Sequence, residues 1–217
     1  MRNSPRPPGT QGYSERAAEL IPHYKAISFT EHHRIELHLL PERPGRVLDV
    51  GAGIGVDAAW FASRGHEVVA VEPTPEFRAA GTRLYPSPNI EWLDDSLPRL
   101  DLVSASRQTF DAVMLSGVWM HLDEPERREA MPILASLLAP VGVLVLSLRH
   151  GPVPAGRRMF EVSGEETVEL AGRHDLRPVL NMQTESIQAS NRAAGVTWTR
   201  LAFKHAAAIE ARSCLCH

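Results

Sequence analysis

An α/β fold built on a mostly parallel sheet is predicted by three features of this 217-residue sequence. Short apolar segments typical of buried strands alternate with amphipathic segments typical of helices, a pattern that produces parallel strands joined by right-handed crossovers. A glycine-rich turn follows the first strand. The last two strands lie too close in sequence for a crossover helix, which predicts an antiparallel partner at the sheet edge.

Each expected element has its own local signal. The strands are apolar runs bounded by turn residues, and they cover residues 47–50, 67–71, 89–93, 110–115, 141–148, 176–182 and 196–203. The helices carry an apolar face at helical spacing. They cover residues 13–26, 29–40, 55–64, 75–84, 99–107, 125–138 and 163–174. Ser163 is expected to cap the last helix, since Glu165 and Glu166 in its first turn complement the helix dipole.

The turn after the first strand is the most informative segment, and residues 47–55 read VLDVGAGIG. The strand is apolar, as expected where helices cover both faces of a sheet. Asp49 interrupts it near the carboxyl end, where an open α/β sheet places its ligand crevice. Gly51 and Gly53 let the backbone turn sharply and approach a ligand closely. The segment therefore predicts a nucleoside-type cofactor at this turn.

The residues around the turn narrow the choice of cofactor. Dinucleotide sites favour G-x-G-x-x-G, whereas this chain has G-x-G-x-G with Val56 in the place of the third dinucleotide glycine. The second strand ends in Glu72, an acid placed to accept hydrogen bonds from both ribose hydroxyls. An acid beneath the loop, Asp49, suits a ligand that carries an ammonium and a sulfonium but little phosphate.

The segment VLDVGAGIGVDAAWFASRGHEVVAVEP resembles motif I and the following acidic motif of class I S-adenosylmethionine (SAM)-dependent methyltransferases. The small-molecule enzymes with a UbiE-like core are the most similar branch. The resemblance continues in order with WLDDSLP, FDAVMLSGVWMHL and LLAPVGVLVLSLRHG. It is strong over about residues 45–150, and in the rest of the chain it is limited to the layout of the helices and strands. It implies a Rossmann-like three-layer sandwich with a seven-stranded, mostly parallel sheet whose last strand is antiparallel.

The resemblance also implies SAM as cofactor and in-line transfer of its methyl group to an O, N or C atom of a small molecule. It places the cofactor against residues at four strand ends: Asp49, Gly51, Ala52 and Gly53 at the methionine end, Glu72 and Pro73 at the ribose, Asp94 or Asp95 with Ser96 and Leu97 at the adenine, and Ser116 near the methyl group. A solvated pair of turn carboxylates is the alternative for Asp94 and Asp95.

Acceptor residues are sought beyond the fourth and fifth strands. His121 is a candidate general base, because histidine titrates near neutral pH, or else it shapes the cofactor pocket. His150 is the second candidate base. Trp119, Arg149 and, on the N-terminal helices, Tyr24 are candidates for substrate binding, with helix packing or a solvated loop as the alternatives. A guanidinium such as that of Arg149 would suit an acidic substrate, since it grips carboxylates bidentately.

Two other functions stay open: an NAD(P)-dependent oxidoreductase and a non-catalytic SAM-binding regulatory domain. A formal net charge of −3 argues against a large nucleic-acid footprint. The Asn/Asp-Pro-Pro-aromatic tetrapeptide typical of amino-N methylation of nucleic acids and proteins is missing, and its place reads LSGV at residues 115–118. No run approaches the ~18 apolar residues of a membrane span.

We expect one methyltransferase domain over residues 13–205, with residues 13–40 as a lid, after a disordered leader 1–12 and before a tail 206–217. That tail contains Cys214, Cys216 and His217. These three possible ligands at a free end lack a scaffold for metal or redox chemistry. Without a structural disulfide, a cytoplasmic location is expected. The oligomeric state stays open between monomer and homodimer.

Overall fold

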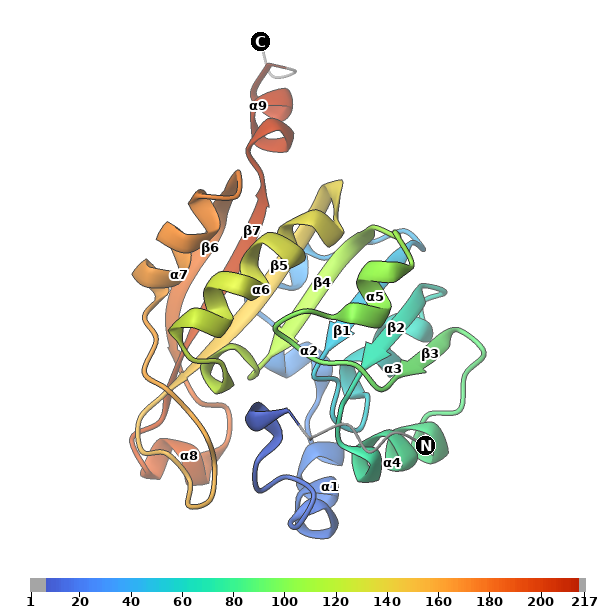
Figure 1. The fold of residues 1–217 in the computed structure, drawn as a ribbon, viewed down its shortest axis with the longest axis vertical. Coiled ribbons are helices and arrows are strands. Elements are labelled where there is room, and N and C mark those ends of the chain that lie inside the picture. The colour runs from blue at the N-terminus through green and yellow to red at the C-terminus, as the bar shows by residue number, and fades with distance from the viewer. Residues whose placement is uncertain (1–6, 215–217) are drawn as a thin grey trace.

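The chain forms one seven-stranded sheet, shown in Figure 1 as a computed structural model that describes residues 7–214. The strand order is β3-β2-β1-β4-β5-β7-β6. Their bounds are β1 Arg46–Val50, β2 Glu67–Val71, β3 Ile90–Leu93, β4 Phe110–Ser116, β5 Leu138–His150, β6 Leu176–Glu185 and β7 Thr197–His205. Only β7 runs against its neighbours. The prediction of a mostly parallel sheet with an antiparallel last strand is confirmed.

The helices are α1 Ala17–Lys25, α2 Phe29–His32, α3 Val56–Ala62, α4 Pro75–Leu84, α5 Asp101–Ala105, α6 Glu124–Leu137, α7 Gly164–Gly172, α8 Ala189–Ala193 and α9 Ala206–Cys214, with 3-10 turns η1 Pro8–Thr10, η2 Leu37–Leu39 and η3 Trp119–His121. Ser163 caps α7 as predicted, its hydroxyl accepting from the Glu166 amide. At the start of α6, Asp123 and Glu126 form a capping box, which satisfies two amide groups reciprocally.

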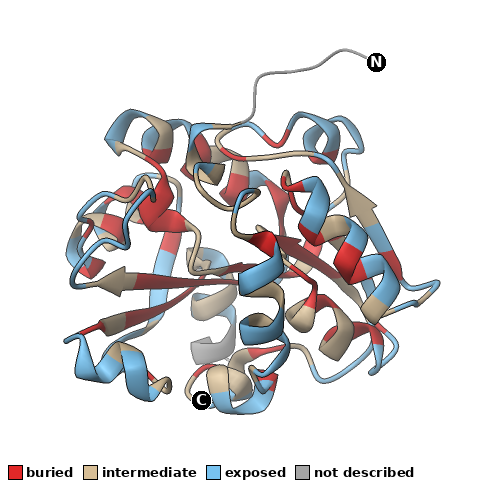
Figure 2. Ribbon diagram, turned by 90° about the horizontal axis from the view of Figure 1, so that it is seen from below, coloured by how far each residue is buried: buried red, intermediate tan, exposed pale blue. Residues whose placement is uncertain are grey.

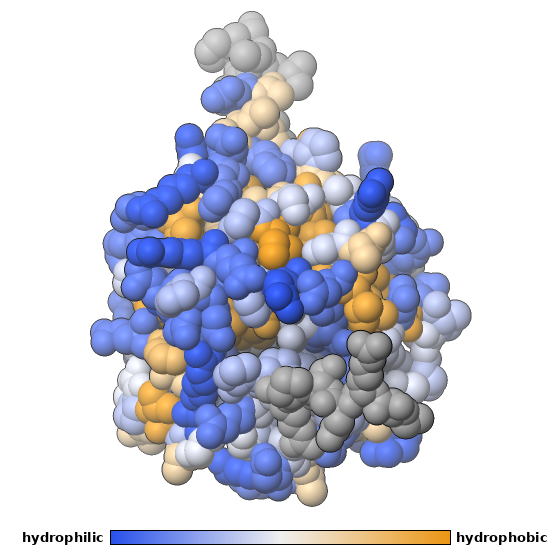
Figure 3. All heavy atoms as spheres, viewed as in Figure 1, coloured by the Kyte–Doolittle hydropathy of each residue, from blue (hydrophilic) through white to orange (hydrophobic). Residues whose placement is uncertain are grey.

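Helices cover both faces of the sheet (Figures 1 and 2), and side-chain alternation along each strand decides what faces them. Leu48 and Val50 pack with α5, α6 and α7, whereas Val47 packs with α2 and α3. Asp49 shares the α2 and α3 side by this alternation. Figure 3 shows the outer side of α5, α6 and α7 as mostly hydrophilic, with apolar residues in small separate groups.

A further group of elements, α1, α4 and α8, lies beyond the carboxyl ends of the parallel strands (Figure 1). There Ala17 of α1 packs with Phe77 and Ala80 of α4 and with Ile54 of the glycine-rich turn in a small core of their own. This core places the N-terminal segment over the edge of the sheet where ligands bind in open α/β folds.

Several boundaries differ from the expectations. Residues 7–12, expected within a disordered leader, include η1, which packs near His121; residues 1–6 lie outside the described residues. The single helix expected over 29–40 is divided into α2 and η2, and His33 and Glu36 between them form a buried polar contact. The segment before β7 contains α8, and the tail contains α9.

Two features of the tail and the surface complete the description. Cys216 lies outside the described residues, and within the part of the chain that is described no cluster of His, Cys, Asp or Glu is arranged to hold a metal ion. Across the same residues, no helix combines the length and the apolar character that crossing a membrane requires.

The indole of Trp92 on β3 fixes the glycine-rich turn against α4. It lies so close to Gly55 and Gly81 that a Cβ on either glycine would meet the ring. Gly55 also has a left-handed backbone, φ +80°, so glycine is favoured there for two reasons. The missing side chains let Trp92 join the start of α3 to α4 beneath the site.

Replacing Gly81 by alanine tests this packing. The new Cβ would collide with the Trp92 ring and lie 2.9 Å from the Ile54 carbonyl oxygen, and overpacking of this kind costs about 1–3 kcal/mol. We expect a lower urea midpoint for Gly81→Ala. Gly172→Ala is the matched control, because a Cβ on this second helical glycine meets only the end of Arg177, 3.9 Å away. Equal midpoints for both variants would contradict the proposed packing.

Candidate active site

A cavity of about 480 Å³ opens at the carboxyl ends of β1, β2 and β4. Its walls come from the glycine-rich turn, η1 and α1, the segment 149–159 after β5, and the segment 186–200 that leads into β7. This volume lies in the range of pockets that bury a small organic ligand. The N-terminal segment and the loop after β5 meet above it, since a Cβ on Gly12 would contact the Gly156 carbonyl.

The glycine-rich turn presents backbone to this cavity. The amides of Gly51 and Ala52 donate to the Val71 carbonyl at 2.8 and 2.9 Å, which anchors the turn to β2. Gly51 has φ +70°, and a Cβ there would lie 2.5 Å from Val118. A Cβ on Gly53 would meet only the ring of Tyr24, at 3.9 Å. The turn therefore leaves room for a ligand to lie directly on its backbone.

Glu72 stands at the end of β2 with its carboxylate held by two backbone amides. Oε2 accepts from the Gly53 amide at 2.8 Å and Oε1 from the Thr74 amide at 2.7 Å. Burial raises the pKa of Glu72. Each oxygen keeps a second lone pair, so the carboxylate can still accept hydrogen bonds from a diol. Apolar cavity residues beside it suit a planar base: Ile54, Phe77, Leu97 and Val118.

Asp49 and Asp57 lie together beneath the turn. Asp49 is 2% exposed and accepts from the Ala58 amide at 3.2 Å; burial, followed by the charge of Asp57, raises its pKa. Asp57 accepts from the Ser116 hydroxyl at 2.7 Å and lies 2.9 Å from His33. Burial alone would raise the pKa of Asp57, but His33 outweighs it and lowers the pKa to about 2.

His33 links the buried carboxylate of Glu36 to the partly buried carboxylate of Asp57. Nδ1 lies 2.8 Å from Glu36 Oε1 and Nε2 lies 2.9 Å from Asp57 Oδ2. Ionised carboxylates only accept hydrogen bonds, so both ring nitrogens carry hydrogen and the ring is an imidazolium. Burial would lower the pKa of His33, but Asp57 and Glu36 outweigh it and raise the pKa to about 9.

The charge network continues into β7. Arg200 lies 3.5 Å from Glu36 and 3.4 Å from the Nε2 atom of His32. Burial, with the charges of His33 and Arg200, lowers the pKa of His32 to about 4. Side chains from α2, α3, β4 and β7 thus form one network, and four of its members line the cavity: His32, Asp57, Ser116 and Arg200.

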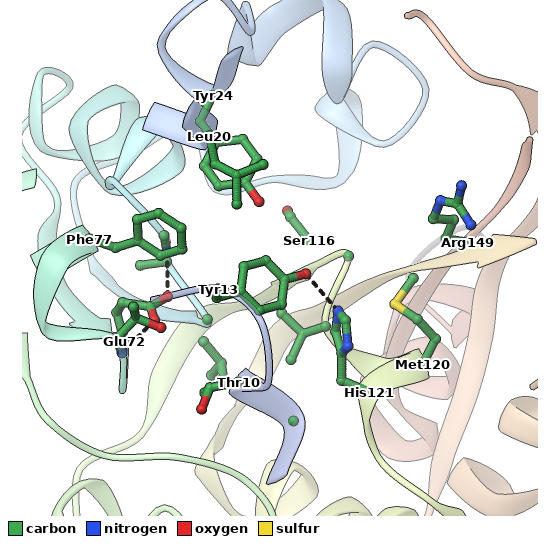
Figure 4. A pocket seen from close by; sticks show the side chains of 18 of the residues that line it. Thr10, Tyr13, Leu20, Tyr24, Glu72, Phe77, Ser116, Met120, His121 and Arg149 are labelled. Atoms are coloured by element: carbon green, nitrogen blue, oxygen red, sulfur yellow. Dashed lines mark hydrogen bonds between the residues drawn. The ribbon is translucent and has the colours of Figure 1, made fainter. Parts of the chain in front are cut away.

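A second polar pair, Tyr13 and His121, crosses the middle of the cavity (Figure 4). His121 Nδ1 lies 2.7 Å from the Arg158 carbonyl oxygen, to which only an N–H can donate, so Nδ1 carries the hydrogen. Nε2 then accepts from the Tyr13 hydroxyl at 2.9 Å. Burial lowers the pKa of His121, which keeps the ring neutral and able to accept a proton.

Most residues expected at the site line this cavity. They are Tyr24, Asp49, Gly51, Ala52, Gly53, Glu72, Pro73, Ser96, Leu97, Ser116, His121 and Arg149. Asp94 and Asp95 do not, because their carboxylates have other partners. Asp94 pairs with Arg78 at 2.8 Å, and Asp95 accepts from the amides of Leu102 and Val103 at the start of α5. The expectation of an adenine contact by either carboxylate is not supported by their positions.

The structure also corrects the expectations for Trp119 and His150. Trp119 begins η3, which turns the fully buried indole into the core against α6 and leaves Met120 and His121 at the cavity. His150 follows Arg149 on β5, so alternation sends the two side chains to opposite faces of the sheet. Its Nε2 lies 2.7 Å from the Thr199 hydroxyl, away from the cavity. Neither the acceptor-binding role for Trp119 nor the base role for His150 is retained.

Sequence reasoning missed the contributions of Tyr13, His33, Asp57 and Arg200. Asp57 stands two residues after Gly55, where an acid in the first turn of a helix is ordinarily explained by the helix dipole. The other three come from distant segments, and no local sequence pattern distinguishes them. The pairing that gives them a role depends on tertiary structure.

Comparison with known proteins agrees with this architecture. Residues 47–142 match the family model described as "Methyltransferase domain". An uncharacterized methyltransferase of Mycobacterium tuberculosis is 29% identical over 163 residues, which cover 70% of this chain and 61% of that protein. Residues 47–142 therefore resemble a methyltransferase domain. The matched range ends early in β5, so it contains the glycine-rich turn and Glu72 of the domain but not Arg149 or Arg200.

Solved structures share the fold of the methyltransferase domain at low identity. The 1,6-didemethyltoxoflavin-N1-methyltransferase of Burkholderia thailandensis, in complex with S-adenosylhomocysteine, has a TM-score of 0.68 at 21% identity and covers 89% of this chain and 85% of its own. The [4+2]-cyclase SpnF has a TM-score of 0.65 at 15% identity, covering 89% and 93%. The fold therefore accommodates more than one chemistry.

The His33 network makes stability depend on pH. A pKa raised from 6.5 to about 9 corresponds to about 3 kcal/mol of stabilisation. This contribution is complete below the unfolded-state pKa of 6.5 and is lost as pH rises through 9. We expect the free energy of unfolding to fall over that range in the wild-type protein and to be lower at pH 6, with a flatter profile, in His33→Gln.

His38→Gln is the control, since His38 is exposed on the same segment. Its urea unfolding curves between pH 6 and 9.5 should follow those of the wild type. A His33→Gln protein with the wild-type slope would contradict an imidazolium between Glu36 and Asp57.

Proposed function

We propose that this chain is a SAM-dependent methyltransferase that acts on a small molecule. The observation that carries the proposal is the Glu72 carboxylate beside an open glycine-rich turn, within a methyltransferase domain and with buried Asp49 beneath the turn. S-adenosylhomocysteine in the structural neighbour from Burkholderia thailandensis supports the choice of ligand.

The residues present fit this cofactor. A Cβ at Gly53 would occupy the surface on which a ligand can lie, whereas glycine leaves it free. We propose that Glu72, beside Pro73, holds the ribose hydroxyls, that the apolar group with Ser96 and Leu97 holds the adenine, and that Asp49 with the turn backbone and Ser116 holds the methionine end. Asp57, whose pKa is lowered to about 2, supplies a negative charge there, which favours an ammonium and a sulfonium.

SAM supplies an activated methyl group on sulfur, and the chain then has to hold the acceptor in line and exclude water. Positioning of this kind lowers the activation free energy by about 7–11 kcal/mol. The N-terminal segment with Tyr24 and the loop after β5 close the cavity from two sides. We propose that the Tyr13 oxygen takes the proton from an acceptor that must lose one, while the hydroxyl proton of Tyr13 passes to Nε2 of neutral His121.

Other functions are less well supported. Val56 in place of the third dinucleotide glycine counts against an oxidoreductase, and the methyltransferase match supports the domain instead. A non-catalytic SAM-binding domain would not need Arg149, Tyr13 and His121 in the cavity. The acceptor atom, O, N or C, the monomer or homodimer state and the cytoplasmic location stay predictions.

Calorimetric titration of the full chain with S-adenosylhomocysteine and NADH tests the proposal. We expect binding of the adenosyl ligand and none of NADH. Glu72→Gln should weaken the affinity by roughly ten- to a hundredfold, because each hydrogen bond to a charged group contributes about 1.5–3 kcal/mol. Glu91→Gln is the control, since Glu91 is exposed on the neighbouring β3. Preference for NADH, or affinity equal in the two variants, would refute the cofactor assignment.

A further inference from the structure

The cavity has opposite charges at its two sides. Asp49, Asp57 and Glu72 lie toward the glycine-rich turn. Figure 4 shows Arg149 on the far side of the Tyr13–His121 pair from Glu72. The negative side matches the positive charges of the proposed cofactor. The proposed cofactor contacts do not yet include a negatively charged ligand group for the positive side.

Arg149 reaches the cavity from the end of β5. Its Nη1 atom donates to the Pro152 carbonyl at 2.8 Å, which steadies the side chain and leaves its other N–H groups free for a ligand. It forms no ion pair with any carboxylate in residues 7–211. The side chain is partly buried, so this is a guanidinium held at the wall of a cavity.

Arg157 reaches the same cavity from the loop after β5. Its guanidinium carbon lies 3.3 Å from the centroid of the Tyr13 ring, and its Nη1 atom is buried without a hydrogen-bond partner. A buried donor without an acceptor costs about 1–3 kcal/mol, more when charged. Within the described part of the chain Arg157, too, has no ion-pair partner.

Neighbouring arginines, by contrast, have carboxylate partners. Arg158 pairs with Asp123 at 2.9 Å and with Glu126 at 2.7 Å, and Arg200 pairs with Glu36. Tyr13 and His121 both lie within electrostatic reach of Arg149 and Arg157. The two unpaired guanidinium groups therefore flank the same pair of residues and add their charges over one part of the cavity.

We propose that Arg149 and Arg157 form a carboxylate-binding pole, which holds either the carboxylate of the cofactor's methionine moiety or a carboxylate of the acceptor. The inference rests on the proposed function and deepens it. Guanidinium donors match the two oxygens of a carboxylate bidentately. A carboxylate would supply the acceptor that Arg157 Nη1 lacks, and its negative charge would offset part of the charge of the two cations.

The first experiment asks whether the carboxylate belongs to the cofactor. S-adenosylhomocysteine and 5′-methylthioadenosine share the adenosine thioether, but the second lacks the amino and carboxyl groups. We measure the dissociation constant of each by calorimetry for the wild-type chain, Arg149→Gln and Arg157→Gln. A tenfold or greater loss for S-adenosylhomocysteine with unchanged methylthioadenosine affinity assigns the pole to the cofactor. Arg157→Lys, which keeps the charge, should lose less than Arg157→Gln.

The second experiment asks whether the carboxylate belongs to the acceptor. A panel of aromatic carboxylates and their primary amides is titrated with and without S-adenosylhomocysteine. Carboxylates that bind more tightly than their amides, with the preference lost in Arg149→Gln or Arg157→Gln, assign the pole to the acceptor. Arg173→Gln is the matched control, because Arg173 is exposed at the end of α7 and pairs with Glu169 there.

The proposal is overturned if both arginine variants bind S-adenosylhomocysteine like the wild type and the panel shows no preference for carboxylates over amides. Thermal unfolding of each variant identifies any that fail to fold, and the lysine variants at both positions then supply the comparison. A wild-type chain that binds neither adenosyl ligand refutes the proposed function instead. In that case, titration of the panel in the absence of S-adenosylhomocysteine still tests whether Arg149 and Arg157 bind carboxylates.

Discussion

A protonated histidine between a buried and a partly buried carboxylate joins the N-terminal segment to the rest of the fold, and the shape of the cavity depends on it. His33 and Glu36 come from the segment after α2, Asp57 from α3, and Arg200 from β7. A buried charge is tolerated only when paired and hydrogen-bonded. Because each charge in this network compensates another, removal of any one leaves an uncompensated ion beneath the glycine-rich turn.

The cavity is built in two different ways. Its proposed cofactor side comes mainly from β1 to the turn after β3, with Ser116 added at the end of β4, and each strand delivers its residues at its carboxyl end. Its other side is assembled from η1 and α1, the loop after β5 and the segment before β7. The match to the family model covers the first part, whereas η1, α1, the loop after β5 and the segment before β7 lie outside it.

The sequence was sufficient for the sheet and for the positions of Asp49 and Glu72 at the cavity, because both follow from local patterns. It was not sufficient for Asp94 and Asp95, whose carboxylates bond to Arg78 and to amides of α5 instead. Apolar runs predict the strands, and Asp49 and Glu72 are placed by the strand ends alone. The failures had local causes too. A 3-10 turn rotated Trp119 into the core, and the alternation of β5 separated His150 from Arg149. By contrast, the contact of His33 with Asp57 joins residues 24 positions apart and follows no local pattern.

The position of β7 has a consequence for biosynthesis. This strand is inserted between β5 and β6 and pairs with both, although it is the last of the seven to be synthesised. Until residues 197–205 emerge from the ribosome, the edge of β5 has no partner and Arg200 cannot reach Glu36. The nascent chain can thus form the nucleotide side of its pocket before β7 is available to complete the opposite wall.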